Sequence, residues 1–346
     1  MSIKHLQNSI LALLLCTTPA LANSTESPFS ADLLLEMQIE QGKHNHSFFR
    51  SELAPSVQLG GGFFIDGVMV LEPLRDYDGR HTRLFGHEGA FAEEIKLNYA
   101  NGAWGAFIGK FNPAFGMAWD YGRGIWGEDF AEDYEITEKL GFGGSYSFDT
   151  EKAGTHTLTA SSFFADTSFL SGSVITKRDR LHKSDGGASN TENFSSYVVS
   201  LDGDNAAGIE NLYYKLGYRH LAKGLSHEHH ENGYVGTLGY RLDVTPTVTM
   251  DGLVEYANIK HFEASHDDRT YLTTSLITTF HDHWNITASH TKRTISGANK
   301  DDHLLQLSGG YDFGQGTTAE IGYKHTREDS DNSNIVGALI RHNISF

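Results

Sequence analysis

The acidic and aromatic residues between positions 112 and 134 are the part of this sequence best suited to act on a passing solute. The acids are Asp120, Glu128, Asp129, Glu132 and Asp133, and the one base is Arg123. Glycines within the segment permit tight bends. If basic side chains faced these acids across a narrow aqueous gap, the resulting field would order dipolar solutes and bias ion selectivity. The alternative is that the charges only solvate an exposed loop.

Basic residues on predicted strands could supply the opposite charge. They are Lys96, Lys110, Lys139, Lys215, Arg219, Lys324 and Arg341. The sequence does not show which of them lie at the height of the acidic segment. Because the segment is net acidic, it predicts a mild preference for cations.

Histidine is the second unusual feature, with 19 in the chain. The run from His227 to Glu231 contains three histidines and two glutamates, and imidazole with carboxylate can hold Zn²⁺ or Cu²⁺. No rigid spacing, such as two histidines one helical turn apart, supports a dedicated site. We therefore expect no cofactor and no built metal site, the nearest candidates being His227, His229 and His230, which could bind metal only adventitiously.

The N-terminal 22 residues are typical of a secretory signal peptide. A polar start precedes a short apolar run over 10–15, and Ala20-Leu21-Ala22 is a small-residue cleavage pattern. The apolar run is shorter than the roughly 20 residues that a membrane-spanning helix needs. The single cysteine, Cys16, lies in this segment, so the remainder at 23–346 has no disulfide or thiolate chemistry. A net charge of −17 makes nucleic acid an implausible partner.

Strand-like segments recur along the whole of 23–346, and none has convincing helical periodicity. We predict strands over 33–41, 55–65, 68–73, 90–100, 103–111, 135–148, 154–165, 194–202, 211–220, 232–242, 247–258, 270–280, 284–293, 302–313, 317–326 and 334–346. Glycine (37), tyrosine (15) and phenylalanine (21) are abundant, as in long strands with aromatic girdles. Sixteen antiparallel strands can close around an aqueous lumen.

Short and long connections alternate between these strands. Tight turns are predicted at 66–67, 101–102, 149–150, 243–244, 281–282 and 314–316, two of them Asx-Gly hairpin signals. The longer polar segments are 42–54, 74–89, 112–134, 166–193, 221–231, 259–269, 294–301 and 327–333, and 203–210 is longer than a tight turn needs. Such alternation favours a transmembrane barrel over a β-sandwich.

Strand faces support the same interpretation. In 211–220, Leu212, Tyr214 and Leu216 alternate with polar residues that include Lys215 and Arg219. A face that carries charges at this frequency must meet water rather than a packed core. The fold class predicted is therefore all-β, a transmembrane antiparallel barrel with a water-filled interior.

The last strand carries the resemblance to a known family. Val336, Ala338, Ile340, Ile344 and the terminal Phe346 share one parity, and the strand ends on that aromatic residue. This ending resembles Gram-negative outer-membrane porins of the 16-stranded general type, in which the barrel assembly machinery reads the last strand. The resemblance gives Ile340, Ile344 and Phe346 the role of assembly signal. His342 departs from it, because a large apolar residue usually stands there.

The resemblance has further implications. In porins of this type the third external loop folds into the barrel and narrows it, which assigns that role to 112–134. It also implies residence in the bacterial outer membrane with lipid and lipopolysaccharide, and a homotrimer. Some small outer-membrane barrels are enzymes, but this chain has no Gly-x-Ser-x-Gly nucleophile elbow, and we expect no enzyme.

The function expected is a porin for passive diffusion of small hydrophilic solutes and ions. Two alternatives stay open. One is a substrate-specific channel, for example for a metal chelate captured by the histidine-rich loops. The other is a non-conducting barrel that serves as an enzyme or adhesin.

Overall fold

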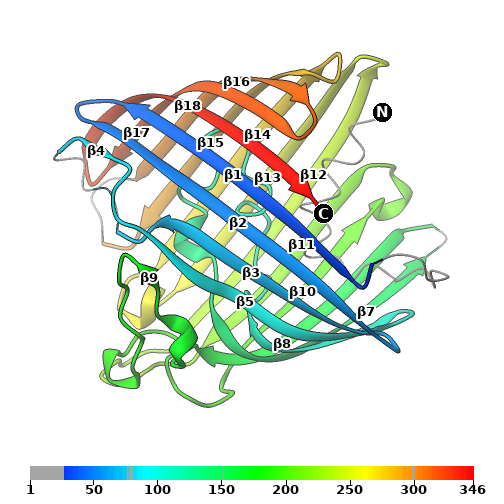
Figure 1. The fold of residues 1–346 in the computed structure, drawn as a ribbon, viewed down its shortest axis with the longest axis vertical. Coiled ribbons are helices and arrows are strands. Elements are labelled where there is room, and N and C mark those ends of the chain that lie inside the picture. The colour runs from blue at the N-terminus through cyan, green and yellow to red at the C-terminus, as the bar shows by residue number, and fades with distance from the viewer. Residues whose placement is uncertain (1–26, 76, 78–80, 151, 298–300) are drawn as a thin grey trace.

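Sixteen antiparallel strands form one closed barrel in the computed structural model (Figure 1). They are β1 (Phe29–Gln41), β2 (Asn45–Gly60), β3 (Phe63–Pro73), β5 (Glu88–Asn101), β6 (Trp104–Phe111), β7 (Lys139–Thr150), β8 (Gly154–Ala165), β10 (Ser196–Asp204), β11 (Leu212–Leu221), β12 (Glu231–Thr245), β13 (Val248–Lys260), β14 (Arg269–Phe280), β15 (Trp284–Ile295), β16 (Asp302–Gly314), β17 (Thr317–Glu328) and β18 (Asp331–Ser345). Each strand pairs with the next along the chain, and β18 pairs with β1 to close the sheet. The all-β class and the strand number are confirmed.

The remaining elements are short and lie in the connections. They are β4 (Arg83–Leu84), β9 (Val174–Ile175) and the 3-10 turns η2 (Glu132–Tyr134), η3 (Phe169–Ser171), η4 (Lys183–Asp185), η5 (Ala206–Gly208) and η6 (Phe262–Ala264). The structure describes residues 27–75, 77, 81–150, 152–297 and 301–346, so the predicted signal peptide lies outside the described residues. Among the residues described, no helix has the length and apolar content needed to cross a membrane.

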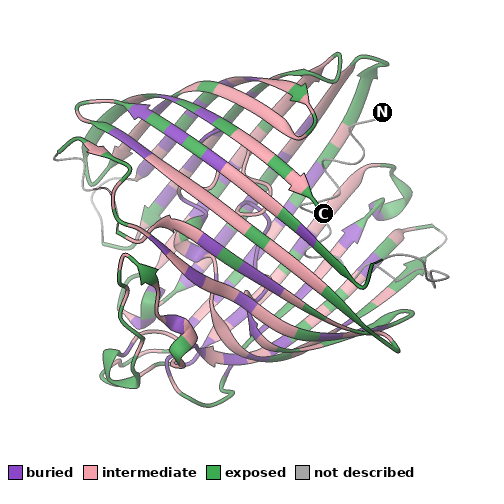
Figure 2. Cartoon of the chain, in the orientation of Figure 1, coloured by how far each residue is buried: buried purple, intermediate pink, exposed green. Residues whose placement is uncertain are grey.

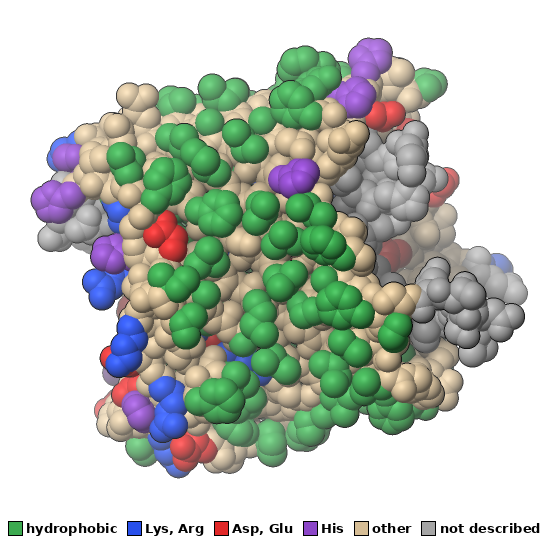
Figure 3. Space-filling view, in the orientation of Figure 1, with side chains coloured by type: hydrophobic (Ala, Val, Ile, Leu, Met, Phe, Trp, Pro, Cys, Tyr) green, Lys and Arg blue, Asp and Glu red, His purple; other side chains and the backbone are tan. Residues whose placement is uncertain are grey.

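Residues alternate between two faces along every long strand, as the striping in Figure 2 shows. In β1, Glu36, Gln38 and Glu40 point inward and are buried, whereas Met37 and Ile39 point outward and are 37% and 46% exposed. Hydrophobic side chains cover the visible outer wall, and charged ones gather at the end that carries β4 and β9 (Figure 3). This pattern is inverted relative to a soluble protein, because the polar residues are those enclosed by the sheet.

Some of the predicted connections are wrong. Asp66-Gly67 lies inside β3, and the reversal before that strand is formed by Gly60, Gly61 and Gly62, all with positive φ. The predicted long loop over 42–54 is mostly strand, because β2 begins at Asn45. Polar residues occupy both faces here, for example Arg50 inward and Ser51 outward, so the stretch lacks the polar–apolar alternation that marks the other strands. The connection before β18 is also short, since β17 ends at Glu328.

The terminal strand has the predicted parity. Val336 and Ile340 point outward and are 49% and 53% exposed, while Leu339 points inward and is 3% exposed. His342 shares the outward parity and lies opposite Thr317, whose Oγ1 is 2.8 Å from the His342 Nδ1 atom. This hydrogen bond gives the imidazole a polar partner at the end of the strand, which explains how a histidine is accommodated there.

Candidate functional site

The segment between β6 and β7, residues 112–138, lies inside the barrel and crosses to the opposite wall. It leaves the wall at Phe111 and returns at Lys139, which are paired neighbours on β6 and β7. Between these points it makes hydrogen bonds to strands as distant as β13, β16 and β1. We call this segment the inner loop. It extends the predicted 112–134 by four residues.

A single carboxylate on β13 holds the first part of the inner loop. Glu255 is 1% exposed and accepts hydrogen bonds from the backbone N–H groups of Met117 (2.6 Å) and Ala118 (3.1 Å). It also accepts from the hydroxyls of Tyr134 (2.7 Å) and Thr237 (2.5 Å). These four donors satisfy both carboxylate oxygens. Buried charge is tolerated where it is hydrogen-bonded in this way.

The tip of the inner loop is held by Trp126, which is 1% exposed. Its backbone N–H donates to the Gln306 Oε1 atom on β16 at 3.0 Å, and its indole N–H donates to Glu40 on β1 at 2.5 Å. The ring lies against Gly337 on β18, where a Cβ atom would come within 2.4 Å of it. Glycine is therefore required at position 337 for the indole to fit.

Ion pairs join the acids of the inner loop to basic residues of the wall. Asp129 pairs with Lys324 on β17 at 2.7 Å, and Asp133 pairs with Arg293 on β15 at 2.8 Å. Glu128 approaches Arg50 on β2 at 3.6 Å. In the reverse sense, Arg123 pairs with Asp251 on β13 at 3.0 Å. Three of the loop acids, Glu128, Asp129 and Asp133, therefore face wall bases, and the two charges of each close pair partly neutralise one another.

Aromatic packing accompanies these polar contacts. Phe115, Phe130 and Tyr134 of the inner loop belong to one buried cluster with wall residues such as Phe163 and Tyr271. Two of these rings also lie under wall cations. The Arg219 guanidinium is 4.7 Å from the Phe115 ring centre, and that of Arg293 is 4.4 Å from the Phe130 ring centre. The arrangement fixes the loop by dispersion and cation–π attraction as well as by charge.

The predicted wall bases are distributed unevenly around the inner loop. Lys324 contacts it, Arg219 donates to the Tyr134 carbonyl at 2.5 Å, and Arg341 pairs with Glu36 and Glu320 on the neighbouring wall. Lys215 pairs with Asp202 at 3.0 Å and Lys96 with Glu94 at 2.6 Å. Lys139 shares the inward parity of Phe111.

Lys110 is not on the inner wall as predicted. It shares the outward parity of Ile108, is 1% exposed, and is enclosed by Glu138, Asp166 and the Leu170 carbonyl. The reason is that β6 is short. The 166–195 connection packs over its end, with β9 paired to β5, and covers the lysine. Of the predicted loop acids, Glu132 is exposed.

Sequence reasoning did not select Glu255, Gln306, Glu40, Asp251, Arg50 or Arg293. Glu255 and Asp251 could have been noticed, because they are the acids of inward parity in a strand whose other face is apolar over 248–256. Arg50 was hidden by the wrong assignment of 42–54 to a loop. Nothing local marks Gln306, because its role depends on a partner 180 residues away along the chain.

The Asp120 carboxyl has an altered acidity. Its enclosure within the barrel raises its pKa to about 6, and nearby Glu255 and Glu128 act in the same direction while Lys215 opposes them. Because Asp120 belongs to the inner loop, its ionisation changes the charge that a solute would meet there.

A closed 16-strand barrel with a loop folded into its interior defines the porin-type outer-membrane barrel fold. Solved structures of that class match this chain. The outer membrane channel DcaP of Acinetobacter baumannii matches with a TM-score of 0.58 and 11% identity over 91% of this chain and 97% of that one. The Pseudomonas aeruginosa protein OccK1 matches with a TM-score of 0.53 and 10% identity over 92% and 99%.

An anion-selective porin from Comamonas acidovorans also matches, with a TM-score of 0.53 and 11% identity over 92% of this chain and 100% of that one. Neither a protein-family model nor a curated protein matches the sequence. At such low identities the likeness establishes the fold. The solute has to be argued from this chain's own residues.

Proposed function

We propose that this protein is an outer-membrane porin through which small hydrophilic solutes and ions diffuse passively. The observation that carries the proposal is the ionic interior of the barrel, crossed by a loop fixed to the opposite wall. Inward residues such as Glu36, Arg50, Glu94 and Lys96 need water or ionic partners. A lumen of this kind conducts water-soluble solutes, and the inner loop narrows it.

The outer wall supports insertion in a lipid bilayer. Leu53 in the middle of β2 is 38% exposed and lies between Leu33 of β1 and Met69 of β3, all on the outward face. Near the short turns, Trp284 and Tyr311 lie with ring centres 4.6 Å apart, as in an aromatic girdle. The N-terminal signal peptide and the terminal Phe346, as an assembly signal, would deliver the chain to the outer membrane.

Two adjacent substitutions in β2 test this orientation. Leu53→Arg puts a charge on the outward face near mid-strand, and we expect it to lower the free energy of unfolding by about 2–4 kcal/mol. Ala54→Arg puts the same charge on the inward face, and we expect a much smaller effect. Urea titration of protein folded into lipid vesicles measures both. Equal destabilisation by the two variants would contradict the assignment of faces.

The charge of the inner loop favours a mild cation preference. Its acids outnumber its bases, and acids of the wall such as Glu52 and Glu72 lie near Arg50. A passing cation therefore meets more negative than positive groups. The constricting role belongs to Asp120, Glu128, Asp129, Glu132 and Asp133 together with Arg123 on the loop, facing the inward bases of the wall.

Cation preference should depend on pH. The Asp120 pKa of about 6 means that this carboxyl is ionised above pH 6 and neutral below it. We expect the permeability ratio for K⁺ over Cl⁻ to fall as the pH is lowered from 7.5 to 5, measured as the reversal potential in a KCl gradient. Asp120→Asn should reduce the change over this interval. A ratio that stays constant in the unmodified protein would contradict the assignment.

Liposome swelling with sugars of graded size tests passive diffusion. Uptake that declines smoothly with solute size and ignores stereochemistry supports a general porin. Saturable uptake of one solute supports the substrate-specific alternative instead, and absence of uptake by correctly folded protein would support a non-conducting barrel.

We further propose a homotrimer, on the resemblance of the terminal strand and loop plan to general porins, and cross-linking in mild detergent tests it.

A further inference from the structure

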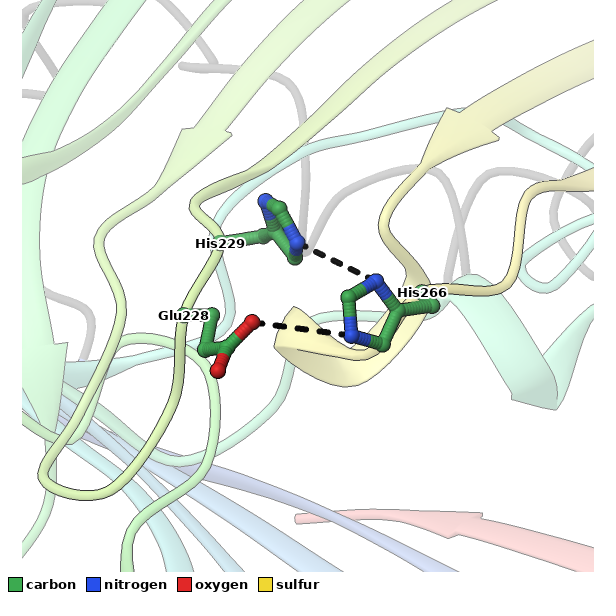
Figure 4. A group of neighbouring side chains, drawn as sticks. All are labelled: Glu228, His229 and His266. Atoms are coloured by element: carbon green, nitrogen blue, oxygen red, sulfur yellow. Dashed lines mark hydrogen bonds and ion pairs between the residues drawn. The ribbon is translucent and has the colours of Figure 1, made fainter.

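Two external loops bring histidines and a carboxylate together at the mouth of the barrel. The 222–230 loop contributes Glu228 and His229, and the 261–268 loop contributes His266 (Figure 4). The His229 Nε2 atom is 3.2 Å from the His266 Nδ1 atom, and the His266 Nε2 atom is 3.6 Å from the Glu228 Oε2 atom. One ligand atom from each side chain lies within 4.8 Å of the others.

We propose that Glu228, His229 and His266 form a binding site for a divalent transition-metal ion, with Zn²⁺ as the best fit. Two imidazole nitrogens and one carboxylate oxygen are a donor set that Zn²⁺ takes with water in the fourth position. Bonds of about 2.0–2.2 Å in a tetrahedron place ligand atoms roughly 3.3–3.6 Å apart. The side chains of Glu228 and His266 are 77% and 78% exposed, so rotation about their own bonds can bring all three donors to this spacing.

A second observation is that a neighbouring side chain, His261, holds the His229 ring in position. The His261 ring stacks on the His229 ring with centres 4.1 Å apart and planes 9° from parallel. The buried His261 Nδ1 atom has no hydrogen-bond partner among the described residues. Its own backbone N–H donates to Asp268 at 3.0 Å, which fixes the start of the loop. His229 is therefore held between two imidazoles rather than free in solvent, as a preorganised ligand should be.

The loop that carries His266 is also fixed to the wall below it. The backbone N–H of Glu263 in η6 donates to Glu231 at 2.6 Å, and Glu231 pairs with Arg219 at 2.6 Å. Phe262 of η6 is 5% exposed and belongs to the same cluster as the aromatic residues of the inner loop. A metal ion would thus link the 222–230 loop to a loop that is already anchored.

This site differs from the set suggested by the histidine run. His227 and His230 are outside it. The His227 Nδ1 atom accepts from the Gly187 N–H at 3.2 Å, and the His230 Nδ1 atom accepts from the Lys223 N–H at 3.2 Å. His266, which supplies the third ligand, lies on another loop and is 36 or more residues away in sequence. The candidate metal site in the structure is therefore formed by side chains from two loops, and not by one run of neighbouring histidines.

Zinc titration of the folded protein tests the proposal. Protein without a polyhistidine tag, folded in detergent, is titrated with ZnCl₂ in competition with a chromophoric chelator. We expect one tight site per chain. His266→Ala and His229→Ala should each weaken it by at least the roughly 10–100-fold that loss of an outer-shell partner costs. Glu228→Gln should weaken it in the same direction.

His227→Ala is the matched control, because it removes a histidine from the same loop but not from the cluster. It should leave the affinity unchanged. Equal loss in His227→Ala and His266→Ala, or tight binding that survives His266→Ala, would overturn the site in favour of adventitious binding by a histidine-rich loop. The heat-dependent gel mobility of each variant verifies folding. Because the titration measures binding alone, its result is independent of whether the barrel conducts.

Discussion

Replacing Glu255 with alanine should release the inner loop and raise the single-channel conductance. The substitution removes the acceptor of four buried donors, two of them backbone N–H groups of Met117 and Ala118 and one the hydroxyl of Tyr134. Each buried donor left without a partner costs about 1–3 kcal/mol. This cost destabilises the inner loop in its position against the wall. It therefore favours a conformation in which the loop is displaced from the wall. Planar-bilayer recording of single channels measures the outcome.

The control is Asp66→Ala. Asp66 is also an inward acid, on β3, but it hydrogen-bonds to Asn98 at 3.0 Å and lies on another part of the wall. It should change conductance little. If Glu255→Ala conducts like the unmodified protein while its barrel stays folded, the inner loop is not held in the way described.

The second large effect is expected at Arg293. Its guanidinium pairs with Asp133 of the inner loop at 2.8 Å, with Asp302 of β16 at 2.9 Å and, by a short contact, with Glu328 at the end of β17. Arg293→Gln would leave these carboxylates close together without their shared counter-ion. Breaking a buried pair by removing one partner costs about 3–5 kcal/mol. We expect a loss of that size in the free energy of unfolding in urea.

Lys292→Gln provides the comparison on the same strand. Lys292 is the preceding residue, shares the outward parity with Ala288 and pairs with Asp301 at 2.6 Å, but its side chain is 40% exposed. Exposed pairs contribute roughly 0–1 kcal/mol, so little stability should be lost. A similar loss in the two variants would show that the three inward contacts of Arg293 contribute no more than one exposed ion pair.

The barrel could be predicted because its signals are local and repeated. Alternation of polar and apolar residues in strands such as β11 and β17, and the terminal strand ending at Phe346, are properties of single segments. Turn signals located several hairpins, for example at Gly314-Gln315-Gly316. Where two possible turn sequences lay close together, the wrong one was predicted as the turn. Asp66-Gly67 suggested a turn, although the three preceding glycines at 60–62 formed it.

The site was predicted only in part, because its geometry depends on contacts between distant segments. The acids of the inner loop were identified from composition, yet the residues that hold the loop were not. Glu255 looks like any inward acid until Met117 and Tyr134 are placed beside it. In the same way, His229 acquires a metal-binding partner only when the fold brings His266 from another loop.

Single-channel recording of the unmodified protein in a KCl gradient tests the central claim most directly. A barrel with an ionic lumen narrowed by an acidic inner loop should give discrete conductance steps, proportional to voltage, with a reversal potential of the sign that indicates cation preference. Protein that is folded, as judged by heat-dependent gel mobility, but gives no steps would contradict the account of a water-filled channel. Steps with a clear anion preference would contradict the role assigned to the acids of the inner loop.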